Sequence, residues 1–355
     1  MESAIPKHLQ CPRSRQPRKS AEYDPPYPAW TARLPETLTQ ITMAYLGVQC
    51  PKGKESAALA TVATLVHQLA LKDPAAFHDI AHYTDEAGYP TWMVMAYWPS
   101  VDAFQRWQAQ PDVANWWSAP ARTTEGLGHF REVFTPHVNR FETLFSNDRF
   151  EGAAHMATAR SDEIREHGYW GGMRDRLPAS QTDAMSSPAH AQISELPSSA
   201  KGRVKLMGHD NIALIRSGQE WTETTDKERE QYLKDIEPTL RVGMDFLRDK
   251  GQSIGCYFNR FVQLVDLQGK PVEKSFGMSL WHTLEHMEGW SESHITHVNI
   301  FGKFMQMVGD LGGPNLKLRL YHEVSVLQAS EQSYEYVNCH PHTGLLKTLA
   351  PAAKL

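Results

Sequence analysis

The chain has 355 residues, of which 41% are hydrophobic, and a formal net charge of −5. This length can bury one large core or two joined cores, and the small negative charge provides no field that would attract nucleic acid or anionic lipid. No apolar run is long enough for a membrane span, the basic N-terminus lacks the apolar stretch of a secretory signal, and the four cysteines show no CxxC or CxxCH spacing. We therefore expect a cytoplasmic protein that binds neither nucleic acid nor membrane.

Taken in chain order, the hydrophobic pattern predicts strands and helices that alternate behind an irregular, Pro-rich arm over residues 1–36. The predicted strands cover residues 39–49, 91–98, 129–145, 204–217, 256–267, 272–280, 316–326 and 333–338. The predicted helices cover residues 55–71, 100–107 and 226–247, and further helices are predicted between the strands at 272–280 and 316–326. Ser100 is expected to cap the second helix, and Pro238 to kink the third. Residues 177–202, rich in Ser, Pro and Ala without periodicity, predict a connector.

The second half of the chain repeats the first with a shift of 183 residues. Trp98, Ser100 and Trp107 fall on Trp281, Thr283 and Trp290 in this register. The repeat and the element order predict an α+β fold made of two ferredoxin-like halves, residues 37–176 and 203–355, whose sheets face each other in a barrel-type arrangement. Facing sheets would enclose a cavity for a flat, apolar guest.

At two positions the second half carries a histidine that the first half lacks: His297 falls opposite Ala114, and His322 opposite Arg131. His297 lies on or beside the apolar stripe of a helix, where a histidine is more often a satisfied core residue than a ligand. His322 alternates with Leu318 and Leu320 along a strand and should share their inward face. Two inward histidines from opposite elements would suit a cofactor cavity in the second half, one as ligand and one as acid/base.

A second group of histidines permits a different interpretation. His282 and His286 are spaced i, i+4, and with His294 and His297 they resemble a zinc cluster. The glutamate between the first two is misplaced for the zinc-protease pattern. We favour a solvated helix face, because Glu285 shares that side.

Five strings in order resemble the aldoxime dehydratases, a family of haem enzymes, and the similarity runs over nearly the whole chain. These strings are Glu166–Arg176 (EHGYWGGMRDR), Gly208–Gln219 (GHDNIALIRSGQ), Ser293–His297 (SHITH), Leu318–Val326 (LRLYHEVSV) and Asn338–Gly344 (NCHPHTG). The resemblance implies haem b with ferrous iron in the active state, a homodimer, and conversion of aldoximes to nitriles with loss of water.

The resemblance also implies a role for each matching residue. His297 matches the proximal iron ligand, His322 the distal acid/base, Ser217 the hydroxyl that binds the oxime OH, and Arg176 the distal arginine. Glu142 matches, less closely, an acid paired with that arginine. These residue types suit the reaction, since the hydroxyl must be protonated before it leaves nitrogen and histidine ordinarily exchanges protons near neutral pH.

Two other function classes stay open at this stage. A haem peroxidase or a small-molecule sensor on the same fold would use similar ligands, and a haem-free α+β barrel would merely bind small apolar molecules. The chain departs from the family by four extra residues in Gly309–Asn315, which bear on cavity shape.

Overall fold

The structure, a computed structural model, describes residues 1–197, 202–313 and 315–349. Residues 198–201 of the expected connector and Pro314 of the expected longer loop lie outside the described residues. The helices are α1 (Glu55–Leu69), α2 (Val101–Gln108), α3 (Pro111–Ser118), α4 (Gly172–Arg176), α5 (Asp226–Gln231), α6 (Glu237–Lys250), α7 (Leu284–Ser293) and α8 (Ile295–Asp310). Short 3₁₀ segments are η1 (Lys7–Leu9), η2 (Pro120–Thr123), η3 (Val138–Arg140), η4 (Gly152–Met156), η5 (Pro178–Gln181), η7 (Gly251–Ile254), η8 (Ala329–Glu331) and η9 (Gly344–Thr348). Among the described residues, every helix is too short or too polar to span a lipid bilayer.

The strands are β1 (Ala32–Arg33), β2 (Thr42–Gln49), β3 (Phe77–Thr84), β4 (Pro90–Trp98), β5 (Gly128–Phe134), β6 (Phe141–Phe145), β7 (Ala159–Arg160), β8 (Ser194–Leu196), β9 (Arg203–Met207), β10 (Ile212–Glu220), β11 (Cys256–Val265), β12 (Pro271–Trp281), β13 (Arg319–Leu327) and β14 (Gln332–Val337). Twelve of these strands form one antiparallel sheet in the order β6-β13-β10-β12-β11-β3-β4-β2-β5-β14-β9-β8, and β1 pairs separately with β7.

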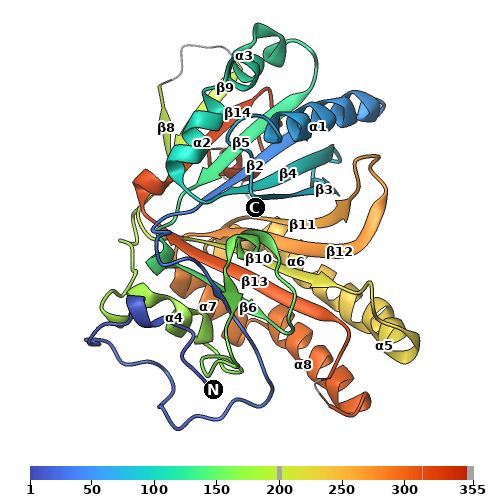
Figure 1. Ribbon diagram of the computed structural model, residues 1–355. Coiled ribbons are helices and arrows are strands. Elements are labelled where there is room, and N and C mark those ends of the chain that lie inside the picture. Colours follow the sequence, from blue (N-terminus) through green and yellow to red (C-terminus); the bar gives the residue numbers. More distant parts are fainter. Residues whose placement is uncertain (198–201, 314, 350–355) are drawn as a thin grey trace.

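The sheet divides into two half-sheets where β11 meets β3, since these strands pair at only two register positions. Figure 1 shows the half-sheets one above the other, with α1, α2 and α3 outside one of them and α6, α7 and α8 outside the other. Side chains of both half-sheets share one hydrophobic core between them. The molecule therefore has three layers of side-chain packing: the shared core, and one helix-covered face on each side.

Local sequence explains these elements. Every residue of β2 is buried, because Tyr45 faces the shared core while Leu46 packs under α1. Ser100 and Thr283, the two hydroxyls that the internal repeat places in register, cap α2 and α7 by accepting a backbone N–H three residues further on. The cap predicted at Ser100 is confirmed.

From β2 and from β10 onward, both halves of the chain run strand, helix, two strands, two helices, two strands, when α5 and α6 are taken as one helix interrupted by a π-helical turn. The last strand of each half pairs outside its own half, since β6 lies against β13 and β14 lies against β5. The N-terminal arm covers the outer edge of β6, where Trp30 and Phe145 exchange backbone hydrogen bonds of 3.0 and 2.8 Å. A cut at the connector would divide the sequence into halves but would not divide the sheet.

Three sequence predictions differ from the structure. The single strand expected at residues 129–145 is wrong, because η3 separates β5 from β6 and these strands lie in different half-sheets. The single strand expected at residues 204–217 is wrong: β9 and β10 flank Gly208–Asn211 and lie in different half-sheets. Asn211 has a φ of 64°, a left-handed conformation that breaks a strand. The expected kink at Pro238 takes the form of a π-helical turn, Tyr232–Ile236, just before the proline in the first turn of α6.

Candidate functional site

Arg176 and Glu142 form a buried ion pair on the helix-covered face of the second half-sheet. Arg176, in the last turn of α4, donates from Nε to Glu142 Oε2 at 2.7 Å and from Nη2 to Oε1 at 3.0 Å, and its Nη1 donates to the Glu166 carbonyl at 2.7 Å. Both residues are about 95% buried. Burial opposes the charged carboxylate, but Arg176 and then His322 outweigh it and hold the pKa of Glu142 below its ordinary value. The pair is a fixed, desolvated charge arrangement.

His322 lies against this pair. Its Nε2 is 2.7 Å from Arg176 Nη2 and 3.1 Å from Glu142 Oε1. In the antiparallel register of β10 and β13, Ser217 stands directly opposite His322, so their side chains leave the same face of the sheet. Glu142 is on this face too, because it stands opposite Val324, two residues beyond His322. The structure thus brings together four of the five predicted site residues.

The direction of His322 refines the sequence prediction. Arg319, Tyr321 and Glu323 of β13 are buried and face the core between the half-sheets, whereas His322 and Leu320 are only half-buried on the opposite face. His322 therefore points toward the helices and not into the shared core. That face is the one that α8 covers (Figure 1).

His297, the fifth predicted residue, lies in the first turn of α8. Its Nδ1 is 2.7 Å from the Ser291 carbonyl, which fixes the proton on Nδ1 and leaves Nε2 with a free lone pair. Burial lowers the pKa of His297 to about 4, although the bond to Ser291 acts in the opposite direction. The rings of Trp290 and Trp170 lie 4.7 and 5.4 Å from the imidazole. His297 is thus a neutral imidazole with one nitrogen available as a metal ligand.

The residues that face each other from α8 and the sheet suit a flat, apolar cofactor. The C-terminal half of α8 packs on the sheet, where Met307 contacts the cluster that includes Leu318. In the N-terminal half, Phe301 remains 38% exposed one turn after His297. Ser217 is also exposed, although its strand has two neighbours on each side in the sheet. An exposed residue in mid-sheet and exposed aromatic surface on the covering helix indicate room between them, and the donor set suits haem, which takes a neutral histidine on one side.

Other candidate clusters do not form such a site. Glu285 and His286 are exposed, which fits the solvated helix face that we favoured over a zinc cluster. The described residues contain no group of three or more His, Cys, Asp or Glu arranged to bind a metal ion. His294 instead caps α8 through its ring nitrogen.

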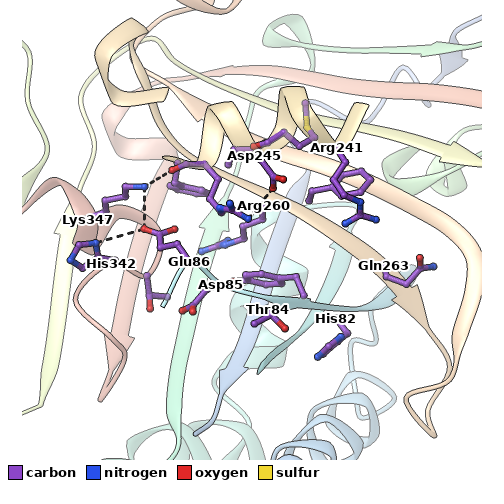
Figure 2. Close-up of a pocket in the computed structure, with 18 of the residues that line it drawn as sticks. His82, Thr84, Asp85, Glu86, Arg241, Asp245, Arg260, Gln263, His342 and Lys347 are labelled. Carbon is purple, nitrogen blue, oxygen red and sulfur yellow. Dashed lines mark hydrogen bonds and ion pairs between the residues drawn. The ribbon is translucent and has the colours of Figure 1, made fainter. Parts of the chain in front are cut away.

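A cavity of about 320 Å³ lies beside the short contact of β3 with β11, under α6 and η9 (Figure 2). Its charged side chains pair with one another, as Lys347 does with Glu86 at 3.1 Å and Arg248 with Asp245 at 2.9 Å. None of the five predicted site residues lines it. Since a porphyrin requires apolar walls and an axial ligand, this charged cavity is not where we place a cofactor.

Sequence reasoning missed the partners that hold the site together. The Glu166 carbonyl, the Ser291 carbonyl and the ring of Trp290 each contact a predicted residue. Backbone carbonyls carry no signal in the sequence. Trp290 did carry one, because the internal repeat matches it to Trp107, but that match also fits a core residue.

Comparisons with known proteins agree with this geometry. Residues 44–345 match the family model of haem-containing dehydratases. The chain is 48% identical to an aliphatic aldoxime dehydratase of Pseudomonas chlororaphis over 98% of both chains, and 34% identical to a phenylacetaldoxime dehydratase of Bacillus sp. (strain OxB-1) over 91% of this chain and 92% of the relative.

Solved structures give the same result. A crystal structure of an aldoxime dehydratase superposes with a TM-score of 0.92 at 48% identity, covering 98% of both chains. Another aldoxime dehydratase, co-crystallised with butyraldoxime, superposes with a TM-score of 0.93 at 45% identity, covering 98% of this chain and 96% of the other. The mixed helix and sheet architecture is therefore that of these enzymes, and the chain belongs to the family of haem-containing dehydratases.

Proposed function

We propose that this protein converts aldoximes to nitriles by removing water, with haem b as its cofactor. The observation that carries the proposal is the cluster of Glu142, Arg176 and His322 beside Ser217, on the sheet face that lies opposite the helix of His297. The names of the relatives support the proposal, since one is an aliphatic aldoxime dehydratase and the other a phenylacetaldoxime dehydratase.

The proposal assigns the proximal position to His297. Its hydrogen bond to the Ser291 carbonyl orients the ring and raises the electron density on Nε2. His297 would hold the haem, and ferrous haem, when bound, would supply electron density to the oxime as the N–O bond breaks.

The other residues act on the hydroxyl and the proton. Ser217 would hold the oxime OH by a hydrogen bond, directly across from His322. His322, when protonated at Nε2, would give its proton to the departing oxygen and then accept the proton from the oxime carbon. Arg176 Nη2 and Glu142 Oε1 both contact His322 Nε2, at 2.7 and 3.1 Å. Arg176 can donate a hydrogen to this nitrogen, and Glu142 can accept one from it. The alkyl or aryl tail would lie among the apolar residues of this face.

The test is direct. Haem-loaded protein reduced with dithionite and kept free of air should convert butyraldoxime to butyronitrile, detected by gas chromatography. The air-oxidised protein should form much less nitrile, and carbon monoxide should inhibit the reduced protein by competing for the open iron position. Equal turnover by the ferric protein, or activity with peroxide alone, would favour the peroxidase-like alternative. A protein that purifies colourless and takes up no haem would remove the proposal.

We also propose that the two halves are duplicated ferredoxin-like units and that the chain forms a homodimer in the cytoplasm. The shared element order and the symmetric exchange of β6 and β14 support the duplication. Val242 of α6 and Ile295 of α8, each 63% exposed, offer apolar surface that a second copy would cover. The four free cysteines suit a reducing compartment. Light scattering coupled to size-exclusion chromatography tests the dimer.

A further inference from the structure

A small chamber lies between the N-terminal arm and the edge strand β6, behind the Glu142–Arg176 pair. Its volume is about 40 Å³, and both residues of the pair line it. The arm contributes Ala4 and Thr31 to its walls, and β6 contributes Thr143. A polar cavity holds a water molecule once it offers about 10–15 Å³ to water-sized probes. The chamber therefore has room for water.

Polar groups with unused hydrogen-bonding capacity reach this chamber. A guanidinium has five N–H hydrogens. Arg176 uses one at Nε on Glu142, two at Nη2 on Glu142 and His322, and one at Nη1 on a backbone carbonyl, which leaves one Nη1 hydrogen. The contact between His322 and Glu142 uses Oε1, so Oε2 receives only the Nε hydrogen and can accept another bond. The hydroxyls of Thr31 and Thr143, 2.9 Å apart, add two polar groups to walls that are otherwise mostly apolar.

We propose that this chamber receives the water that each dehydration releases. The inference rests on the proposed function and extends it. In the reaction the C–H and N–O bonds of the aldoxime break, the C≡N bond is completed, and the carbon-derived proton compensates the one that His322 gives to the leaving hydroxyl. One water and one nitrile result, with no other reactant. The water forms beside His322, whose ring contacts Arg176 and Glu142, and the chamber lies on the far side of that pair.

Water has a reason to leave in this direction. In the proposed binding mode the oxime carbon and its tail would lie on the other side of the departing oxygen, so the substrate would block that way out until the nitrile dissociates. The Glu142–Arg176 pair offers hydrogen bonds to a departing water molecule, whereas the apolar tail of the substrate offers none. The chamber thus separates the exit of water from the exit of nitrile.

Two alanines of the arm allow a matched test. Ala4 and Ala29 are 5% and 2% exposed and belong to one hydrophobic cluster with Ile164, but only Ala4 lines the chamber. Leucine at either position should overpack this cluster to a similar extent, while only Ala4→Leu fills the chamber. We expect Ala4→Leu to lower kcat and KM together, each by roughly five- to tenfold, at unchanged kcat/KM, because product release then limits turnover. Ala29→Leu should keep the wild-type kcat.

Two further measurements keep the inference open to refutation if Ala4→Leu does not fold. Thr31→Val preserves volume and removes one polar wall group, and it should lower kcat in the same direction. A high-resolution crystal structure of the wild-type holoenzyme should show ordered water in the chamber bonded to Arg176 or Glu142. A dry chamber in an active enzyme, or equal kcat for Ala4→Leu and Ala29→Leu, would overturn the chamber alone. Wild-type holoenzyme that forms no nitrile would overturn the proposed function, and the product-water role with it.

Discussion

The position of His322 allows one nitrogen to serve two partners. A neutral Nε2 accepts the hydrogen of Arg176 Nη2 at 2.7 Å, whereas a protonated Nε2 can donate to Glu142 Oε1 at 3.1 Å. Because one nitrogen cannot do both at once, its protonation state selects its partner. The ring keeps a hydrogen bond in either state, so a proton can leave and return with little movement of the side chain.

At this scale the first prediction concerns the iron ligand. His297→Ala should purify with little haem, because the neutral Nε2 that would bind iron is lost. His286→Ala is the matched control, since His286 is exposed on the preceding helix. His294 is a poorer control because it caps α8. Absorbance at the Soret band relative to total protein measures the haem content, and a wild-type ratio in His297→Ala would refute the assignment.

A second prediction separates binding from catalysis. His322→Ala should retain haem and still bind aldoxime, since neither the proximal ligand nor Ser217 is altered. Turnover should fall by about 10²- to 10⁴-fold, the usual contribution of a general acid or base. The readout is paired: an aldoxime-induced change in the ferrous spectrum, with nitrile formation followed in the same sample. Near-normal turnover would make His322 a packing residue.

The third prediction uses the lowered pKa of Glu142. A carboxyl whose pKa falls on folding stabilises the protein above its unfolded value, here about 4.5, and this contribution disappears as the pH falls through the lowered folded value. Glu142→Gln leaves Arg176 buried without its charge partner, which costs about 3–5 kcal/mol at pH 7. The difference in free energy of unfolding between wild type and Glu142→Gln should therefore shrink below pH 4.5.

Urea denaturation of wild type and Glu142→Gln across this pH range measures that difference. Glu285→Gln provides the control, because Glu285 is exposed on α7 and should change stability little at any pH. A Glu142→Gln deficit that is constant from pH 7 to pH 3 would show that the ion pair is not its cause.

At the scale of elements, the register of β10 and β13 decides whether the site exists. Ser217 and His322 meet only because every residue from Ile212 to Glu220 pairs in sequence with Leu327 to Arg319. A shift by one residue would move Ser217 to the shared core. Gly218 secures this register by close packing, since a Cβ there would lie 2.2 Å from the ring of Tyr321.

Gly218→Ala should therefore destabilise the fold by about 1–3 kcal/mol, as overpacking of a buried site does. Gly289→Ala should have the opposite effect. Gly289 lies in α7 with nothing within 4 Å of its Cβ position, so alanine there should raise the free energy of unfolding by about 0.5–1 kcal/mol. Thermal or urea unfolding measures both changes. Equal stability of the two variants would contradict the role of Gly218.

Several elements could be predicted from the sequence because their signals are local. The cap at Ser100, the two strands β11 and β12, and the strand that carries His322 all follow from residues within a few positions of one another. The break between β9 and β10 was missed, because an apolar pattern continues across Gly208–Asn211 and only long-range pairing separates the two strands.

The candidate site was predictable in a different way. Periodicity indicated His297 and His322, but spacing alone could not distinguish a ligand from a core histidine. The family resemblance supplied Arg176, Ser217 and Glu142. Their contact depends on a strand exchanged between the halves, which no local pattern reports.

At the scale of the whole molecule, the exchanged strands make the halves interdependent. Residues 203–355 alone would lack β6 and expose the edge of β13, and residues 1–202 alone would lack β14. We expect each fragment alone to aggregate or remain unfolded, while co-expression restores a soluble, haem-binding complex. Sedimentation and haem content measure the outcome. A separately folded second fragment that binds haem would show that the exchange is dispensable.

Because β6 is synthesised early but pairs with the late strand β13, it must wait for its partner during biosynthesis. Glu142 leaves the ribosome long before His322, and at roughly 5–20 residues per second the interval is about ten seconds or more. During that time the nascent strand has no β13 beside it, and Arg176 lacks its partner His322. The cofactor can be loaded only after translation is almost finished, so haem supply and chaperone protection of the early strands should limit the yield of active enzyme more than the rate of synthesis does.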